Sequence, residues 1–456
     1  MLQQGLIEKI LDYGLSHGAD FTEVFAEDVS RSFVSMSGEK ITDMVGGREQ
    51  GVGIRLFFGD QLRYFYSEEL EESALFRKMS ALCRDRSGTV PVYRSGLTQK
   101  RKYTMNGAGA SWTQKANLLK KCNLAGKEAS DFVMSMDSSY QDMDQRVLIA
   151  NSEGCYVEDR RQKTRLFIDA IAKDNGEIRS SYVGPGAMAG FEFYETIDPE
   201  AYARQAAKQA ESLLHAKPCP VGRMPIVIAN GFGGLFFHEV CGHSLEATGA
   251  AYDASEFSGR FGQKIASSKV TLIDDGSMAD EWGSLHVDDE GIPTQKNTLI
   301  ENGILRGYLV DRWNGRKLHM APTGSSRRQS YRFAPTSRMT NTYIAPGTDK
   351  LDEMIRDVDQ GLFVRNIYAG SVHPATGEFN FNTREAFLIE NGKIPVPVRE
   401  ATLIGTGGEI LHKVDRVASD YKMGQGFCYS ESGALFIGAG QPAVRISDIT
   451  VGGDDV

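Results

Sequence analysis

The stretch LFFHEVCGHSLEA, from Leu235 to Ala247, holds the residues with the clearest chemical potential. His238 and His243 lie five residues apart, and Glu239 follows the first histidine directly. Two imidazoles suit Zn²⁺, and a neighbouring glutamate can act as a general base toward water. In the usual H-E-x-x-H motif, however, the histidines are four residues apart. The pattern therefore indicates a metal-dependent hydrolase if this wider spacing still places both rings on one ion.

In a regular α-helix the extra residue turns the second histidine away from the first. Four steps of about 100° bring a side chain back to within about 40° of its start, whereas five steps leave it about 140° away. A π-helical turn of about 4.4 residues reduces that separation to about 50°. Gly242 tolerates unusual backbone angles and would ease the distortion. We therefore predict a π-bulge between His238 and His243.

The segment is apolar on nearly all sides, which predicts a buried helix. Its exceptions are His238, Glu239, His243 and Glu246. Such groups cost several kcal/mol to bury without a partner, and a shared metal ion would be one. The alternative is that both histidines are ordinary core residues bonded to backbone carbonyls.

A catalytic zinc site usually has three protein ligands and leaves a fourth position to water. Cys241 and Glu246 each follow a histidine by three residues, so either could share its helix face. Cys428 lies in the loop-like segment KMGQGFCYSESGALFIGAGQP and could approach from elsewhere in the fold. The spacing leaves all three open as the third ligand. Glu239 is the candidate base, with zinc or another divalent transition metal as the cofactor.

Helix and strand patterns divide the chain into two predicted domains, 1–217 and 218–456. A chain of 456 residues exceeds the usual size of one hydrophobic core. Prolines and a glycine in HAKPCPVGRMP interrupt regular structure at the predicted boundary. In the first domain, the spacing of apolar residues predicts helices over 7–15, 67–83, 112–129 and 199–214, and a hairpin that turns at Gly59 and Asp60.

The second part is predicted to be rich in strands around the buried metal-binding helix. Two hairpins in it turn at Asn-Gly pairs, residues 302–303 and 391–392, which suit type I′ turns. The expected fold class is α+β, with mixed and largely antiparallel sheets and flanking helices.

Composition excludes several classes of partner. With 51 basic and 60 acidic residues, the net charge of -9 offers no overall attraction to nucleic acid or anionic lipid. No apolar run approaches the ~18 residues that span a bilayer. Glu8 and Lys9 interrupt any signal-peptide core, and the six cysteines form no C-x-x-C pair. We expect a cytoplasmic protein with reduced thiols and without membrane or direct nucleic-acid partners.

Several ordered motifs between about Arg223 and Gly453 resemble the TldD/PmbA family, in particular its TldD branch. They are FFHEVCGHSLEA, DDEGIPTQKNTLIENGILRGYLVDRWNGRKL, PTGSSRRQSYR, RMTNTYIAPG, GEFNFNTREAFLIENGKI, ATLIGTG and GAGQPAVRISDITVGG. The resemblance implies a metalloprotease for peptides or unfolded polypeptides, with His238, His243 and Cys428 as metal ligands. After Cys428, YSESGALFI departs from the family's glycine-, lysine- and aspartate-rich run.

The resemblance also implies a dimer, either of identical chains or with a PmbA-like subunit. Some members are described as modulators of DNA gyrase. The alternative function is therefore a non-catalytic subunit that binds peptides or a protein partner without cutting them.

Two other polar clusters are interpreted as structural. The segment HVDDEG, residues 286–291, could bind a cation or a substrate amine, but a polar turn is favoured. A group of arginines could anchor a substrate carboxylate or backbone, although a solvated strand face is slightly favoured. The group comprises Arg327, Arg328, Arg332 and Arg338. Tyr331 and Arg332 are further candidates for stabilising an oxyanion.

Overall fold

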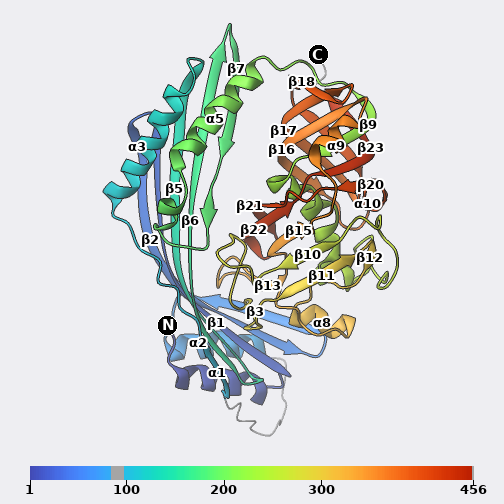
Figure 1. Ribbon diagram of the computed structural model, residues 1–456. Helices are drawn as coiled ribbons and strands as arrows, with labels where there is room; N and C mark the ends of the chain where they lie inside the picture. The colour runs from blue at the N-terminus through green and yellow to red at the C-terminus, as the bar shows by residue number, and fades with distance from the viewer. Residues whose placement is uncertain (84–96, 454–456) are drawn as a thin grey trace.

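The protein is an α+β structure whose sheets carry helices on their outer faces (Figure 1). The computed structural model describes residues 1–83 and 97–453. The sheets are largely antiparallel, and a closed barrel lies in the C-terminal region. The predicted fold class is confirmed. Within the described part of the chain, no helix has the length and apolar character needed to cross a membrane.

One eight-stranded sheet contains every described strand before residue 217. Its hydrogen-bonded order is β3-β2-β1-β5-β6-β4, and β7 and β8 also pair with β6. The strands are β1 (Phe21–Ser37), β2 (Lys40–Phe58), β3 (Gln61–Ser67), β4 (Gln99–Lys102), β5 (Val133–Asn151), β6 (Cys155–Asp174), β7 (Glu177–Val183) and β8 (Gly186–Ala187). Long antiparallel ladders join β2 to β1, β1 to β5 and β5 to β6.

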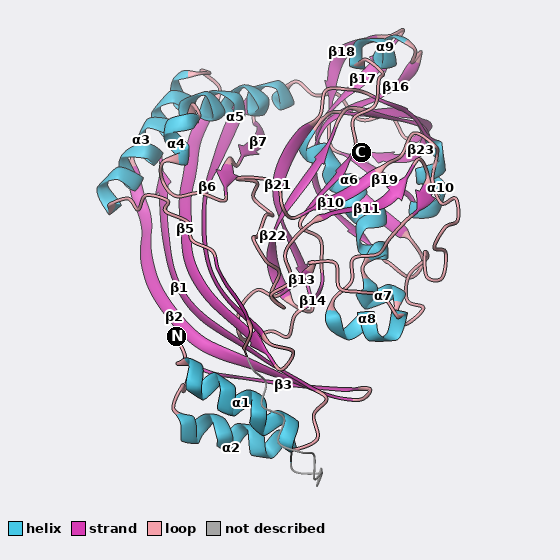
Figure 2. Ribbon diagram, turned by 60° about the horizontal axis from the view of Figure 1, so that its bottom comes forward, coloured by secondary structure: helices cyan, strands magenta, loops and turns pink. Residues whose placement is uncertain are grey.

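Helices pack against both ends of this sheet (Figure 2). They are α1 (Gln4–Ser16), α2 (Glu72–Cys83), α3 (Trp112–Glu128), α4 (Phe193–Thr196) and α5 (Pro199–Leu214). The helices α1 and α2 share one apolar cluster with the sheet, and α3, α4 and α5 share another. The four predicted helices and the hairpin turn are confirmed. The second helix begins later than predicted, because the chain up to Ser67 still belongs to β3.

Strands after residue 217 form the barrel and two further sheets. The barrel order is β16-β9-β23-β19-β17, and pairing of β16 with β17 closes it. Its strands are β9 (Gly222–Ile228), β16 (Gln360–Val372), β17 (Glu378–Glu390), β19 (Ala401–Thr406) and β23 (Val444–Gly453), with β18 (Lys393–Val398) and β20 (Val414–Val417) attached. The other strands are β10 (Leu272–Asp275), β11 (Lys296–Glu301), β12 (Ile304–Leu305), β15 (Asn341–Ile344), β21 (Lys422–Ser430) and β22 (Gly433–Gln441) in one sheet, and β13 (Ser326–Arg327) with β14 (Thr336–Ser337) in another.

Both predicted Asn-Gly hairpin turns are present, between β11 and β12 and between β17 and β18. The two central residues of each turn have positive φ, as a type I′ turn requires. Short helices complete this part of the chain, namely α6 (Leu235–Phe237), α7 (Ala247–Ala250), α8 (Arg312–Leu318), α9 (Leu351–Arg356) and α10 (Gly407–Lys413).

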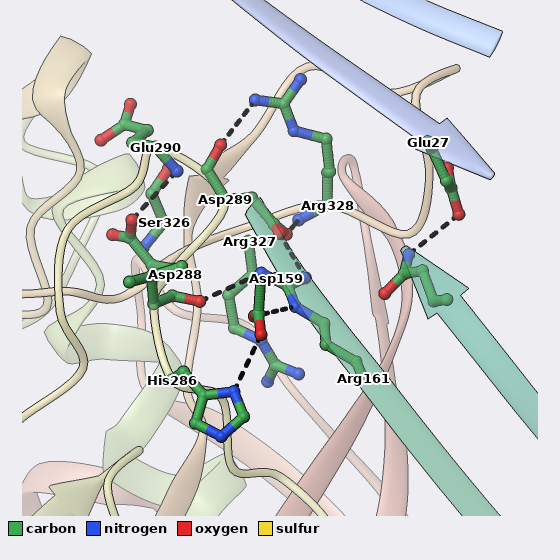
Figure 3. A network of polar contacts seen from close by, with 12 residues as sticks. Glu27, Asp159, Arg161, His286, Asp288, Asp289, Glu290, Ser326, Arg327 and Arg328 are labelled. Carbon is green, nitrogen blue, oxygen red and sulfur yellow. Dashed lines mark hydrogen bonds and ion pairs between the residues drawn. The ribbon is translucent and has the colours of Figure 1, made fainter. Parts of the chain in front are cut away.

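A buried ionic network joins the N-terminal sheet to the C-terminal region (Figure 3). From β6, Asp159 contacts His286 at 2.8 Å and Arg161 contacts Asp289 at 2.7 Å. Arg328 also reaches back to Glu23 of β1, at 2.7 Å.

The sequence interpretation is confirmed for one of these polar clusters and wrong for the other. HVDDEG does form a turn, in which Asp288 accepts hydrogen bonds from the backbone of Glu290 and Ile292, but the turn is buried, and Asp289 and Glu290 pair with arginines of the N-terminal sheet. The arginines are not a solvated strand face, because Arg327, Arg328 and Arg338 are all buried. Burial follows from tertiary pairing, which local sequence does not reveal.

Candidate metal centre

The histidine segment is an irregular helix inside the largest apolar cluster. After α6 the chain forms a π-helical turn over His238–Gly242 and then a 3₁₀ turn over His243–Leu245. Glu246 adopts an extended conformation and ends the helix. The predicted π-bulge is confirmed, and so is the burial of the apolar residues around it.

Gly242 has a different role from the one expected. Its backbone angles, φ −59° and ψ −52°, are ordinary helical values that any residue can adopt. A Cβ atom at this position would lie 2.2 Å from Sδ of Met339. The glycine therefore permits close packing against Met339 rather than an unusual backbone conformation.

The π-helical turn brings both histidines to one cluster with a distant cysteine. One potential ligand atom from each of His238, Glu239, His243 and Cys428 lies within 4.8 Å of the others. Nε2 of His243 is 3.2 Å from Sγ of Cys428 and 3.6 Å from a carboxylate oxygen of Glu239. Cys428 comes from β21, which forms an antiparallel hairpin with β22.

The other two candidate ligands lie elsewhere. The thiol of Cys241 donates to the carbonyl oxygen of Phe237 at 3.2 Å, and burial strongly raises the pKa of this thiol. A carboxylate oxygen of Glu246 is 3.1 Å from Nδ1 of His243, whereas Cys428 contacts the other ring nitrogen, Nε2. Glu246 therefore orients His243 and does not join the cluster.

The environment of His238 argues against an ordinary core histidine. The side chain is fully buried, and neither ring nitrogen has a hydrogen-bond partner among the described residues. Burial, followed by the nearby His243, lowers the pKa of His238 well below its usual value, so the ring is neutral. A neutral imidazole with a free lone pair is the form that binds metal ions. These residues therefore fit a divalent transition metal.

Burial and nearby charges shift the pKa values of His243 and Glu239. Burial by itself lowers the pKa of His243, but Glu246 and Cys428 outweigh it and raise this pKa well above the usual value. Burial raises the pKa of Glu239, and His243 partly opposes that rise.

A cavity of about 720 Å³ opens onto the cluster. Glu239, His243 and Cys428 line it together with Arg165 and a largely aromatic wall. The wall includes Phe167, Tyr182, Phe232, Tyr368, Phe427 and Tyr429. The described lining includes neither Tyr331 nor Arg332, whose side chains both contact Glu68. This placement does not support the oxyanion role considered for them.

Family models match most of the chain. They are described as domain 1, the central domain and the C-terminal domain of PmbA/TldA metallopeptidases, and they cover residues 22–83, 109–214 and 221–453. The chain belongs to the PmbA/TldD family. Its C-terminal match contains the whole histidine and cysteine cluster.

Relatives in this family carry the name metalloprotease. A metalloprotease TldD homolog of Haemophilus influenzae is 34% identical over 89% of this chain and 87% of its own length. A metalloprotease of Methanothermobacter thermautotrophicus is 34% identical over 95% of this chain and 96% of its own.

Solved structures of other proteins share the fold. TldE from Thermococcus kodakarensis superposes with a TM-score of 0.77 at 18% identity, over 98% of this chain and all of that one. A candidate modulator of a DNA gyrase from Thermotoga maritima gives 0.77 at 20% identity, again over 98% and all of the two chains.

Sequence reasoning missed Arg165, which comes from the N-terminal sheet yet lines the cavity of the C-terminal cluster. The signal was present in EDRRQKTRLF, where charged residues alternate along a strand. Side chains alternate along a strand, so the odd-numbered residues of β6 share one face. Their contacts show that this face is turned toward the C-terminal region.

Proposed function

We propose that this protein is a metal-dependent peptidase in which His238, His243 and Cys428 hold a zinc ion or a similar divalent metal. The observation that carries the proposal is the buried, unpartnered imidazole of His238, which faces a second histidine, a cysteine and a carboxylate. Two nitrogens and one sulfur form a donor set typical of zinc. The metalloprotease names of its relatives support the same reaction.

Glu239 is the general base of the proposed reaction. When bound, the metal supplies Lewis acidity that polarises the scissile carbonyl. Glu239 accepts a proton from the attacking water and passes it to the leaving amine. Glu246 holds the His243 ring through Nδ1, which leaves Nε2 directed toward the cluster.

The proposed substrates are peptides or unfolded polypeptides, because a cavity of about 720 Å³ admits a short extended segment rather than a folded domain. We also propose domains at 1–217 and 218–456, a cytoplasmic location, and assembly with a second copy or a PmbA-like subunit. The likeness to TldE supports the last of these.

The replacement Glu239→Gln tests the mechanism. It removes the base while the other three residues of the cluster remain. We expect kcat/KM for an unstructured peptide to fall by about 100-fold or more, with the metal content by mass spectrometry unchanged. A matched control is Glu256→Gln, because Glu256 accepts a hydrogen bond from Gly408 and does not line the cavity. If metal-loaded wild type cleaves no faster than Glu239→Gln, the protein is a binding subunit instead.

A further inference from the structure

Three buried cations beside the metal centre lack a carboxylate partner. Within the described residues, Lys163, Arg165 and Arg327 form no ion pair, and their side chains donate hydrogen bonds to backbone carbonyls alone. We call these three side chains the cationic junction. Other buried arginines differ, because Arg55 and Arg161 each contact two carboxylates.

A buried cation without a carboxylate in direct contact is costly, because it loses hydration and more distant carboxylates, such as Asp289 near Arg327 and Asp159 near Lys163, compensate only in part. Burial lowers the pKa of both Arg165 and Arg327 to about 10. Burial also lowers the pKa of Lys163, and the neighbouring Arg327 lowers it further. An anion placed among them would relieve this cost.

The cationic junction lies between two cavities. Lys163 and Arg327 line a cavity of about 930 Å³ between the N-terminal sheet and the C-terminal region, and Arg165 lines the metal-site cavity. The ring of Phe427 belongs to both linings. Lys163 and Arg165 both lie over the ring of Trp282, at 5.6 and 5.4 Å from its centroid. A chain bound in the metal-site cavity therefore has Arg165 beside it, and Lys163 lies over the same Trp282 ring as Arg165.

Arg165 is the member closest to the chemistry. It is 2% exposed, and one terminal nitrogen of its guanidinium has no hydrogen-bond partner in the described structure. Its other donors contact the carbonyl oxygens of Gly184 at 3.2 Å and Gln425 at 3.0 Å. Gln425 lies three residues before Cys428 on the same strand, so these contacts fix the guanidinium relative to the cluster.

We propose that the cationic junction binds a carboxylate of the peptide substrate, with Arg165 in direct contact. This inference rests on the proposed peptidase function and adds a substrate class to it. The planar guanidinium matches a carboxylate, and the low polarity of the surrounding rings strengthens the pair. The carboxylate is either the C-terminus of the peptide or an Asp or Glu side chain.

The decisive measurement is peptide binding, because it does not depend on turnover. Metal-loaded Glu239→Gln protein is titrated with two fluorescent peptide pairs by anisotropy. The first pair shares one sequence and ends in either a C-terminal acid or a C-terminal amide. The second is a set of pairs in which one internal position at a time carries either Asp or Asn. We expect one pair to favour the carboxylate by roughly 10- to 100-fold. The pair that responds identifies the source of the carboxylate.

Affinities within about twofold in both pairs would overturn the proposal, and this comparison needs no change to Arg165. Adding Arg165→Met should reduce the preference to about twofold or less. The control is Arg384→Met, because Arg384 packs on Tyr182 and Tyr368 behind the same cavity without lining it. The preference for the carboxylate peptide should persist in Arg384→Met. Its loss in both Arg165→Met and Arg384→Met would indicate a general effect of positive charge instead.

The two proposals can fail separately. A carboxylate preference in a protein that hydrolyses no peptide would leave the cationic junction valid and remove the peptidase. Hydrolysis without a carboxylate preference would support the peptidase and remove the role of the cationic junction. If Arg165→Met does not fold, Arg165→Lys replaces it. The ammonium group cannot pair with both carboxylate oxygens in the planar geometry of a guanidinium, so the preference should fall about tenfold.

Discussion

His243 uses its two ring nitrogens differently at the candidate metal centre. Its Nε2 faces Cys428 and Glu239, while its Nδ1 is 3.1 Å from Glu246. Glu246 is itself held, because its other oxygen accepts a hydrogen bond from the backbone of Met339 at 3.3 Å. A ring fixed in this way loses little freedom when it binds a metal.

Glu246→Gln should therefore weaken metal binding although Glu246 is outside the cluster. The amide keeps the shape of the side chain but loses the charge that orients His243. We expect metal affinity to fall by about 10- to 100-fold in competition with a chromogenic chelator. Glu256→Gln serves as the control. Unchanged affinity in Glu246→Gln would contradict a positioning role.

At the scale of elements, one π-helical turn and one strand hairpin assemble the cluster. The turn over His238–Gly242 corrects the five-residue spacing, and β21 delivers Cys428 against it. Gly242 leaves room for the side chain of Met339 to pack closely against the turn.

Gly242→Ala should lower the free energy of unfolding by about 1–3 kcal/mol, because the new methyl group would overlap Sδ of Met339. The measurement is urea denaturation of the metal-free protein. Gly5→Ala is the matched control, since Gly5 is also helical and a Cβ atom there meets nothing within 4 Å. That control should be unchanged or more stable by up to about 1 kcal/mol. Equal stability of the two variants would show that Met339 moves aside for the new methyl group at little cost.

The whole molecule depends on buried charges that cross from the N-terminal sheet to the C-terminal region (Figure 3). The odd-numbered face of β6 supplies Asp159, Arg161, Lys163 and Arg165 to this interface. Residues from both sides of this interface line each of the two cavities, and Arg165 of β6 lines the same cavity as His243 and Cys428.

Asp159→Asn should destabilise the protein in a pH-dependent way. Burial raises the pKa of Asp159, but hydrogen bonds from His286 and Arg161 outweigh it and lower this pKa below the usual 3.8. A lowered folded-state pKa adds stability above the unfolded-state pKa, and that stability is lost as the pH falls through the folded-state pKa. We expect a loss of about 3–5 kcal/mol at pH 7 that shrinks below about pH 4.

Urea denaturation at several pH values, followed by tryptophan fluorescence, measures this difference. Asp448→Asn is the control, because Asp448 pairs with Arg223 on the surface with 40% of its side chain exposed. Its effect should stay within about 1 kcal/mol. A loss for Asp159→Asn that persists undiminished at pH 3 would contradict the charge-based explanation.

The sequence by itself determined the local elements and predicted that His238, Glu239 and His243 share one site. Helical periodicity, Asn-Gly turns and the apolar setting of His238 and His243 depend on neighbours in the chain, so they can be read from short windows. The π-helical turn followed from spacing alone. The choice of Cys428 came from family resemblance, because spacing gave no preference over Cys241 or Glu246.

The tertiary structure alone decided which distant groups meet. Arg165 is separated from Cys428 by more than half the chain, and a β-rich fold brings such residues together through pairings that no local pattern encodes. The same cause reversed the interpretation of Arg327 and Arg328, since a charged run looks solvated until another sheet covers it. Local forces act within a turn or a strand, whereas burial is a property of the packed whole.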